Sequence, residues 1–177
     1  TFAEEVVSAT LNRQMNGTPV VISALVQMPE KPNGKAILIF PGWPGIPRIE
    51  ERDGKTNYFY LQEHFEEMGP TLRAAGITTV TVDCPTDQWG VRGFHPTACD
   101  DNYRSSAQHA EDVASLISKL RNMGAIQHIT IMGHSYGAVS SHWLSLRLNH
   151  GEIQSAIHSA SQTVAAGGAF QQYASSR

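Results

Sequence analysis

Cysteine, charge and long apolar runs are all scarce in this sequence of 177 residues. Charged residues make up 16% of it and the formal net charge is −3, with an isoelectric point near 6.2. The chain therefore lacks the basic excess that binds nucleic acid or an anionic membrane surface. No apolar run approaches the roughly 18 residues that a membrane-spanning helix needs. We expect neither a nucleic-acid partner nor a membrane span.

The two cysteines, Cys84 and Cys99, fall in one stretch rich in proline, glycine and aspartate. They are close enough in sequence to form a disulfide, but two free thiols fit the sequence at least as well. The compartment is therefore left undetermined. No Cys/His or His/carboxylate spacing indicates a metal site, and the sequence has no glycine-rich phosphate loop. We expect no metal and no cofactor.

The remaining composition is that of an ordinary globular protein. Hydrophobic residues amount to 41%, and a chain of this length can bury a substantial core. We expect a single domain over residues 1–177. Residues 162–177 are rich in alanine, glycine, glutamine and serine, and we expect them to form either a cap or a poorly ordered tail.

Apolar patterns with strand and helix periodicity alternate along the chain. A hairpin is expected over residues 5–28, with its turn at Asn16-Gly17. Residues 46–55 are polar and indicate a loop. The other expected elements are strand 36–40, a helix from 57 broken at Gly69-Pro70, strand 77–82, a helix from 101 or 102, strand 128–132, a helix over 136–148 and strand 153–157. This alternation favours the α/β class, with a mainly parallel sheet, helices on both faces and an N-terminal antiparallel hairpin.

The segment around Ser135 gives the clearest chemical signal. Gly133-His134-Ser135-Tyr136-Gly137 matches the pattern G-x-S-x-G between an expected strand and an expected helix. In such a turn the serine has a strained backbone, which requires small residues two positions before and two positions after it. A plain Gly/Ser turn between strand and helix is the alternative interpretation.

This order of elements resembles the α/β-hydrolase fold over almost the whole chain. The loop Pro41-Gly42-Trp43-Pro44 follows the strand 36–40, where family members commonly have His-Gly-x-Pro, so proline replaces the histidine. The resemblance implies a serine hydrolase that cleaves a small carboxylic ester through an acyl-enzyme on Ser135. It also implies an oxyanion hole made by the backbone N–H groups of Tyr136 and Trp43.

The base and acid of a catalytic triad are not evident after Ser135. The fold's order is serine, acid, histidine, yet the only later acid is Glu152, which we expect at the opposite edge of the sheet. We expect the later histidines His142, His150 and His158 to be structural. The upstream candidates, of which His95 could swing over the serine, are Asp83, Asp87, His95, Asp100 and Asp101.

The resemblance also implies an explanation for the missing base and acid. Six strands of the fold can be counted, whereas the last two, which bear the acid and the histidine, cannot. We expect a C-terminally incomplete fold, the N-terminal part of a hydrolase with about sixty to a hundred further residues. Completion by another chain and a short fold that lost its triad are the alternatives. The exposed edge strand would pair with a complementing C-terminal segment or with a second copy in a homodimer.

Two other functions fit the same residues. A non-catalytic binding module would retain the fold and a vestigial serine turn, and its ligand binding would survive Ser135→Ala. An acyltransferase would use the same serine but would transfer the acyl group to an alcohol or a thiol. The fold alone does not choose among these functions.

Overall fold

The computed structural model describes residues 1–42, 45–61, 63–90 and 99–159. Its strands and helices are β1 (Phe2–Met15), β2 (Thr18–Pro29), β3 (Lys35–Phe40), β4 (Glu50–Arg52), β5 (Lys55–Asn57), α1 (Glu63–Ala74), β6 (Thr78–Val82), α2 (Asp101–Arg104), α3 (Ala107–Arg121), β7 (His128–His134), α4 (Ala138–Arg147) and β8 (Ser155–Ser159). Short 3-10 turns lie at Thr86–Gln88 and Ser135–Gly137. The expected cap or tail at 162–177 lies outside the described residues.

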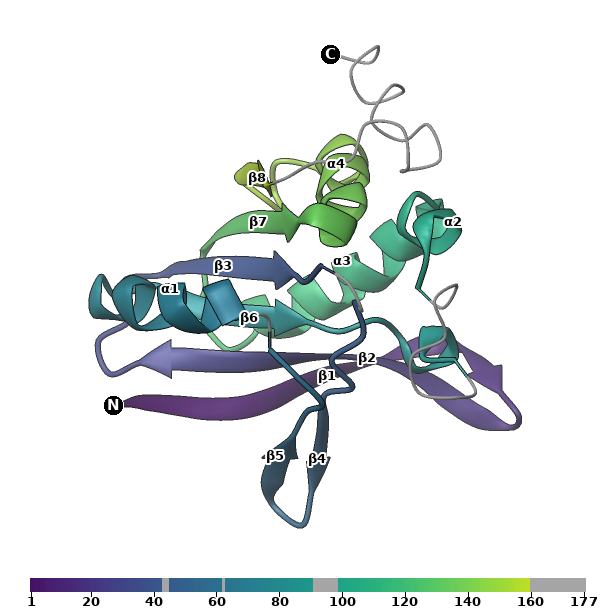
Figure 1. Cartoon of the computed structure of the whole chain (residues 1–177), viewed down its shortest axis with the longest axis horizontal. Helices are drawn as coiled ribbons and strands as arrows, with labels where there is room; N and C mark the ends of the chain where they lie inside the picture. The colour runs from purple at the N-terminus through teal and green to yellow at the C-terminus, as the bar shows by residue number, and fades with distance from the viewer. Residues whose placement is uncertain (43–44, 62, 91–98, 160–177) are drawn as a thin grey trace.

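The main sheet has six strands in the order β1-β2-β6-β3-β7-β8 (Figure 1). β6, β3, β7 and β8 run parallel to one another, and the hairpin β1–β2 joins them through the antiparallel pair β2–β6. The expected fold class is therefore confirmed. Since the parallel strands share one direction, the ends of β3 and β7 meet at the same edge, where ligands of such sheets usually bind.

Helices cover both faces of the sheet, as expected. Successive residues of a strand point to opposite faces, so Leu38 and Phe40 join the core on the side of α3 and α4, whereas Ile37 and Ile39 pack on the side of α1. In Figure 1, α1 and α3 accordingly lie on opposite sides of the sheet. No helix in the described ranges is long and apolar enough to cross a membrane.

The first helix differs from its sequence prediction. We expected it to begin near Asn57, to break at Gly69-Pro70 and to restart as a short helix from Pro70 through Ala75. Instead, α1 begins at Glu63 and continues through the proline. A proline inside a helix removes one main-chain hydrogen bond. Met68 and Leu72, on either side of Pro70, pack against the sheet. This burial holds the helix together across the proline.

The helix expected from residue 101 or 102 is in fact two helices. The Asp100 carboxylate caps the four-residue α2 by accepting hydrogen bonds from the amides of Asn102 and Tyr103. The longer α3 begins after Ser106, whose hydroxyl oxygen accepts from the His109 amide. Both are preferred capping residues, so each helix start has its own local signal. The break between the helices leaves the last residue of α2 in the interior.

Two further segments depart from the prediction. The expected loop 46–55 contains the strand β4, which pairs with β5 through a turn at Asp53 (φ +51°) and Gly54 (φ +74°). The last strand begins two residues later than expected, at Ser155, and Ile153 packs into the core from the turn before it. In the described residues β8 is the edge of the sheet and pairs only with β7.

Candidate active site

The chain turns sharply at Ser135, between β7 and α4. Ser135 has a φ of +52°, in the left-handed region that residues with a side chain rarely adopt. β7 ends at His134, and the 3-10 turn Ser135–Gly137 leads directly into α4. The backbone thus has the strained serine between strand and helix that the sequence pattern predicts.

Two glycines make this turn possible because neither position has room for a side chain. A Cβ at Gly133 would lie closer than 3.0 Å to the Gly137 carbonyl and to the Ser141 hydroxyl. A Cβ at Gly137 would overlap the Phe40 carbonyl in the same way. Real Cβ atoms essentially never approach other atoms so closely. The two glycines of the pattern are therefore required by contact between β7, α4 and the end of β3.

The turn lies beside the loop that leaves β3. Gly133 pairs with Phe40, the last residue of β3, so the loop that begins at Pro41 starts next to the serine turn. Gly45 on this loop has a φ of +78°, and a Cβ there would lie 3.2 Å from Cδ1 of Tyr136. Tyr136, one of the two expected oxyanion donors, therefore lies beside the loop. Trp43, the other expected donor, lies outside the described residues.

Arg104, the last residue of α2, joins the loop to the turn. Its side chain is buried, with 1% exposed. Nε donates to the Cys99 carbonyl at 2.8 Å, and Nη1 donates to the Ser140 hydroxyl at 2.8 Å. Nη2 donates to the Gly45 carbonyl at 3.1 Å. The guanidinium carbon also lies 5.0 Å from the centre of the Tyr136 ring. Burial lowers the pKa of Arg104.

Tyr60 holds the same loop through its hydroxyl. The Gly45 amide donates to Tyr60 Oη at 2.7 Å, and Tyr60 Oη donates to the Gly42 carbonyl at 3.2 Å. Burial raises the pKa of Tyr60 to about 12, so the hydroxyl keeps its proton near neutral pH. The loop is therefore held on both sides of positions 43 and 44. Neither Tyr60 nor Arg104 lies in a sequence motif that would indicate this role.

Cys84 and Cys99 form a disulfide, with their Cα atoms 6.3 Å apart. The sequence allowed either a disulfide or two free thiols, and the structure has the disulfide. The bridge lies beside the loop after β3, since Cys84 Sγ is 3.4 Å from the Gly45 carbonyl. Cys99 supplies the carbonyl that accepts from Arg104 Nε. The disulfide thus fixes one of the partners of the buried arginine.

The acids upstream of the serine have structural contacts of their own. Asp83 is 2% exposed and accepts hydrogen bonds from the amides of Ile49 at 2.7 Å and Cys84 at 2.8 Å. Burial raises the pKa of Asp83 to about 7. Asp87 forms an ion pair with Arg13, with 2.7 Å between Oδ2 and Nε. The structure therefore gives both carboxylates a role in holding the fold.

The histidines after the serine also have contacts away from its hydroxyl. His158 Nδ1 lies 2.8 Å from Ser141 Oγ, and the His158 ring stacks on His142 with centroids 3.9 Å apart. Burial lowers the pKa of His142. His95 lies outside the described residues. Within the described part of the chain, no hydrogen bond joins the Ser135 hydroxyl to a histidine.

The other candidates are held in turns or helix caps. Glu152 accepts from the Asn149 amide at 3.1 Å in the turn before β8, and His150 is exposed in the same turn. Asp100 caps α2, and burial together with the Asp100 charge raises the pKa of Asp101. In the ranges that the structure describes, no group of three or more His, Cys, Asp or Glu side chains could hold a metal ion.

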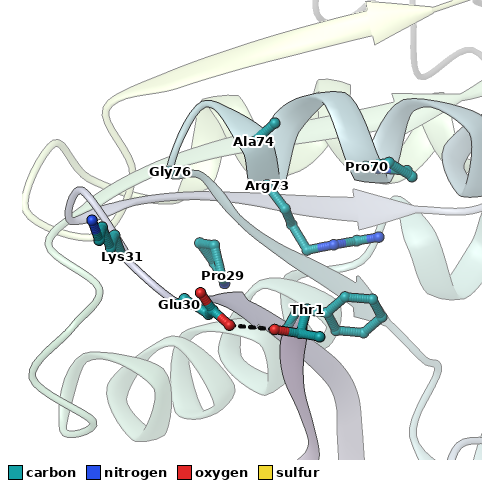
Figure 2. Close-up of a pocket in the computed structure, with 9 residues that line it drawn as sticks. Thr1, Pro29, Glu30, Lys31, Pro70, Arg73, Ala74 and Gly76 are labelled. Atoms are coloured by element: carbon teal, nitrogen blue, oxygen red, sulfur yellow. Dashed lines mark hydrogen bonds between the residues drawn. The ribbon is translucent and has the colours of Figure 1, made fainter.

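A hollow of about 540 Å³ lies at the opposite end of the sheet from Ser135. It is lined by the start of β1, the end of β2 and the residues before β6, and Figure 2 shows Arg73 and Glu30 at its wall. The Thr1 hydroxyl donates a hydrogen bond to the Glu30 carboxylate across one side. Sheets of this kind bind ligands at the carboxyl ends of their strands, so we assign this hollow no role.

No family model and no curated protein matches this chain, but solved structures do. A dienelactone hydrolase from Anabaena variabilis matches 95% of this chain and 68% of its own, with a TM-score of 0.61 and 13% identity. An esterase from Pyrococcus furiosus matches 88% of this chain and 50% of its own, with a TM-score of 0.56 and 12% identity. A thermostable carboxyl esterase from Bacillus coagulans matches 89% of this chain and 44% of its own, with a TM-score of 0.54 and 13% identity.

These similarities concern architecture. The chain spans less than two thirds of the length of either esterase. At 12% to 13% identity a shared fold does not carry a shared reaction with it. The match over most of this chain agrees with the strand order, the N-terminal hairpin and the helices on both faces. The chain therefore has the α/β-hydrolase fold.

Proposed function

We propose that the protein is a serine hydrolase that cleaves a carboxylic ester through an acyl-enzyme on Ser135. The observation that carries this proposal is the left-handed backbone of Ser135, with a φ of +52°. Such strain costs about 1–3 kcal/mol, and residues that retain it cluster at active sites. Glycine would remove the cost if the position served the turn alone. A serine at this position therefore favours a chemical role for its hydroxyl.

The proposed reaction proceeds in two steps. Ser135 Oγ attacks the ester carbonyl while a base takes its proton, and the alkoxide leaves with that proton, which gives an acyl-serine. Water then attacks the acyl carbon and frees the serine. In both steps negative charge develops on the carbonyl oxygen, and the backbone N–H groups of Tyr136 and Trp43 are the proposed donors to it. Removing one such donor typically costs about 2.7–4 kcal/mol of barrier.

In this proposal the base and the acid come from outside the described residues. His158 and His142 are in contact with each other and with Ser141 rather than with Ser135 Oγ, which favours a base from elsewhere. His95 is one candidate for the base. The other candidate source of the base and the acid is a segment that pairs with the exposed edge of β8. This segment would be either a complementing C-terminal segment or a second copy of the chain. In the described ranges β8 pairs only with β7, which agrees with an edge that can accept a partner.

Reaction with a fluorophosphonate tests the proposal directly. The serine oxygen bonds to phosphorus and fluoride leaves, so the peptide that contains Ser135 gains the mass of the phosphonyl group. We expect labelling of the intact native protein, and none after heat denaturation or in Ser135→Ala. Native protein that stays unlabelled at Ser135 would contradict the proposal.

The alternatives give different results in related measurements. An acyltransferase would also be labelled, but an added alcohol or thiol would outcompete water for the acyl group of an ester substrate. A non-catalytic binding module would resist labelling and would bind its ligand equally well after Ser135→Ala. Labelling and acceptor competition together separate the three functions.

A further inference from the structure

Gly45 is held by side chains at both of its backbone polar groups. Its amide donates to Tyr60 Oη at 2.7 Å, and its carbonyl accepts from Arg104 Nη2 at 3.1 Å. The Tyr60 hydroxyl also donates to the Gly42 carbonyl at 3.2 Å. Main-chain groups that are bonded in this way fix the orientation of their peptide planes. The loop after β3 is therefore set by two side chains from outside it.

Arg104 extends this support to the serine turn. Nη1 donates to the hydroxyl of Ser140 in the first turn of α4 at 2.8 Å, and the guanidinium lies 5.0 Å from the centre of the Tyr136 ring. A Cβ at Gly45 would lie 2.6 Å from Arg104 Nη2. Together with its φ of +78°, this contact favours glycine at position 45. One buried side chain touches both structures that carry the proposed oxyanion donors.

The charge of Arg104 has an unusual environment. Within the described residues no carboxylate lies within ion-pair distance of the guanidinium, although the side chain is only 1% exposed. A buried charge is costly unless it is paired. Here two carbonyls and a hydroxyl solvate it. A buried cation beside the serine turn would interact favourably with an oxyanion that forms there.

We propose that Arg104 and Tyr60 are positioning residues that set the loop after β3 against the serine turn, and that the Arg104 charge adds to the stabilisation of the oxyanion. This inference rests on the proposed function of Ser135. Neither side chain touches the reacting atoms in the mechanism above. Both position backbone groups, and a misplacement of about 1 Å can cost roughly a hundredfold in rate. Arg104 adds the field of its charge.

Tyr60→Phe is the decisive variant because it removes a single oxygen atom. We expect Ser135 labelling and the kcat for a short-chain 4-nitrophenyl ester to fall about 10- to 100-fold, with KM changed less than about twofold. Tyr58→Phe is the matched control, since Tyr58 lies two positions away and is 40% exposed. It should leave kcat, KM and the labelling rate unchanged.

Two variants of Arg104 separate the effect of its charge from that of its hydrogen-bond geometry. Arg104→Lys keeps the charge and loses the fork of donors, whereas Arg104→Met loses both. We expect kcat to fall in both variants, and about tenfold further in Arg104→Met. Arg121→Lys is the matched control, because Arg121 also binds main-chain carbonyls, those of Gln127 at 2.5 Å and Glu152 at 2.7 Å, at the far end of the sheet. It should leave kcat unchanged.

The outcomes separate the inference from the function on which it rests. If wild-type protein is labelled and Tyr60→Phe is labelled at the same rate, the positioning role is wrong and the proposed function stands. If wild-type protein is not labelled, the proposed function itself fails. Should the Arg104 variants not fold, Tyr60→Phe still decides. Hydrogen exchange of the Gly45 amide must also accelerate in Tyr60→Phe and not in Tyr58→Phe, and unchanged exchange would overturn the inference.

Discussion

The guanidinium of Arg13 meets the carboxylate of Asp112 edge to edge, with 2.8 Å between Nη1 and Oδ1 and 3.0 Å between Nη2 and Oδ2. Arg13 also binds Asp87, through Nε at 2.7 Å and Nη2 at 3.1 Å. Asp112 in turn accepts from Tyr103 Oη at 2.6 Å. One cation thus serves two carboxylates and connects β1 with α3 and with the 3-10 turn after β6.

Arg13→Met should lower the free energy of unfolding by about 3 kcal/mol. Asp112 is 1% exposed, so removal of the arginine leaves a buried carboxylate without its cation. Urea denaturation would measure the change. Arg52→Met is the control, because Arg52 pairs with Glu50 at 2.6 Å but is 71% exposed, and we expect a loss below about 1 kcal/mol. Equal losses in the two variants would contradict the prediction.

Ser135→Gly should make the protein more stable than Ser135→Ala, by about 0.5–1 kcal/mol. Glycine adopts a φ of +52° without steric cost, and this gain exceeds the entropy that glycine adds to the unfolded chain. Neither variant should react with a fluorophosphonate. Urea denaturation of the two variants side by side measures the difference. Equal stabilities would show that the turn stores no strain.

His109 is buried without a hydrogen-bond partner for either ring nitrogen in the described part of the chain. Its ring packs on Phe40 and Tyr103, with centroids 5.9 Å and 4.9 Å away. Burial lowers the pKa of His109 well below 6.5, and the charges of Arg104 and Arg147 lower it further. The folded protein therefore keeps this histidine neutral at a pH where the unfolded chain protonates it.

Stability should consequently depend on pH through His109. Below pH 6.5 the unfolded state binds more protons at this residue, so folding is weakened as the pH falls. Asp83 acts in the opposite direction, because burial raises its pKa to about 7 and the folded state binds the extra proton. A comparison of variants isolates the histidine. Relative to wild type, His109→Leu should gain up to about 1.4 kcal/mol per pH unit between pH 6.5 and 5.

Denaturation in urea at several pH values measures this difference. His150→Gln is the control, since His150 is exposed in the turn before β8. Its stability relative to wild type should show no comparable trend. A difference between His109→Leu and wild type that does not change from pH 7.5 to pH 5 would contradict the prediction.

Opening the disulfide should affect both stability and the serine turn. The bridge closes a loop with a sequence separation of 15, so its loss should cost about 3 kcal/mol. Ser135 labelling should also slow, because Cys84 and Cys99 contact Gly45 and Arg104. The measurement is denaturation and labelling with and without reductant. In the double variant Cys84→Ser/Cys99→Ser the reductant should change neither, and an equal response there would contradict a role for the bridge.

The parts of the fold that the sequence predicted are those with local causes. Asn16 and Gly17 adopt φ values of +52° and +77°, as the tight turn of the hairpin requires, and their residue types indicate this directly. The apolar run of β3 and the pattern around Ser135 are also local. Asp53-Gly54 carries the same kind of turn signal for β4–β5, although the polar character of residues 46–55 indicated a loop.

The parts that it did not predict depend on contacts distant in sequence. Arg104 lies 59 positions from Gly45 and 36 from Ser140, so no spacing rule connects them. Tyr60 acts 15 positions from Gly45 and lies in no strand or helix. The passage of α1 through Pro70 likewise depends on packing against the sheet, which outweighs the local preference to stop.

The 6.3 Å between the Cα atoms of Cys84 and Cys99 has a consequence for how this protein can diversify. The covalent bond keeps the two anchor points together whatever residues connect them. Closing a longer connection costs little, about 0.6 kcal/mol for each doubling of length. A change in the length of the connection that leaves the Asp87–Arg13 pair in place should therefore keep its anchors beside Gly45.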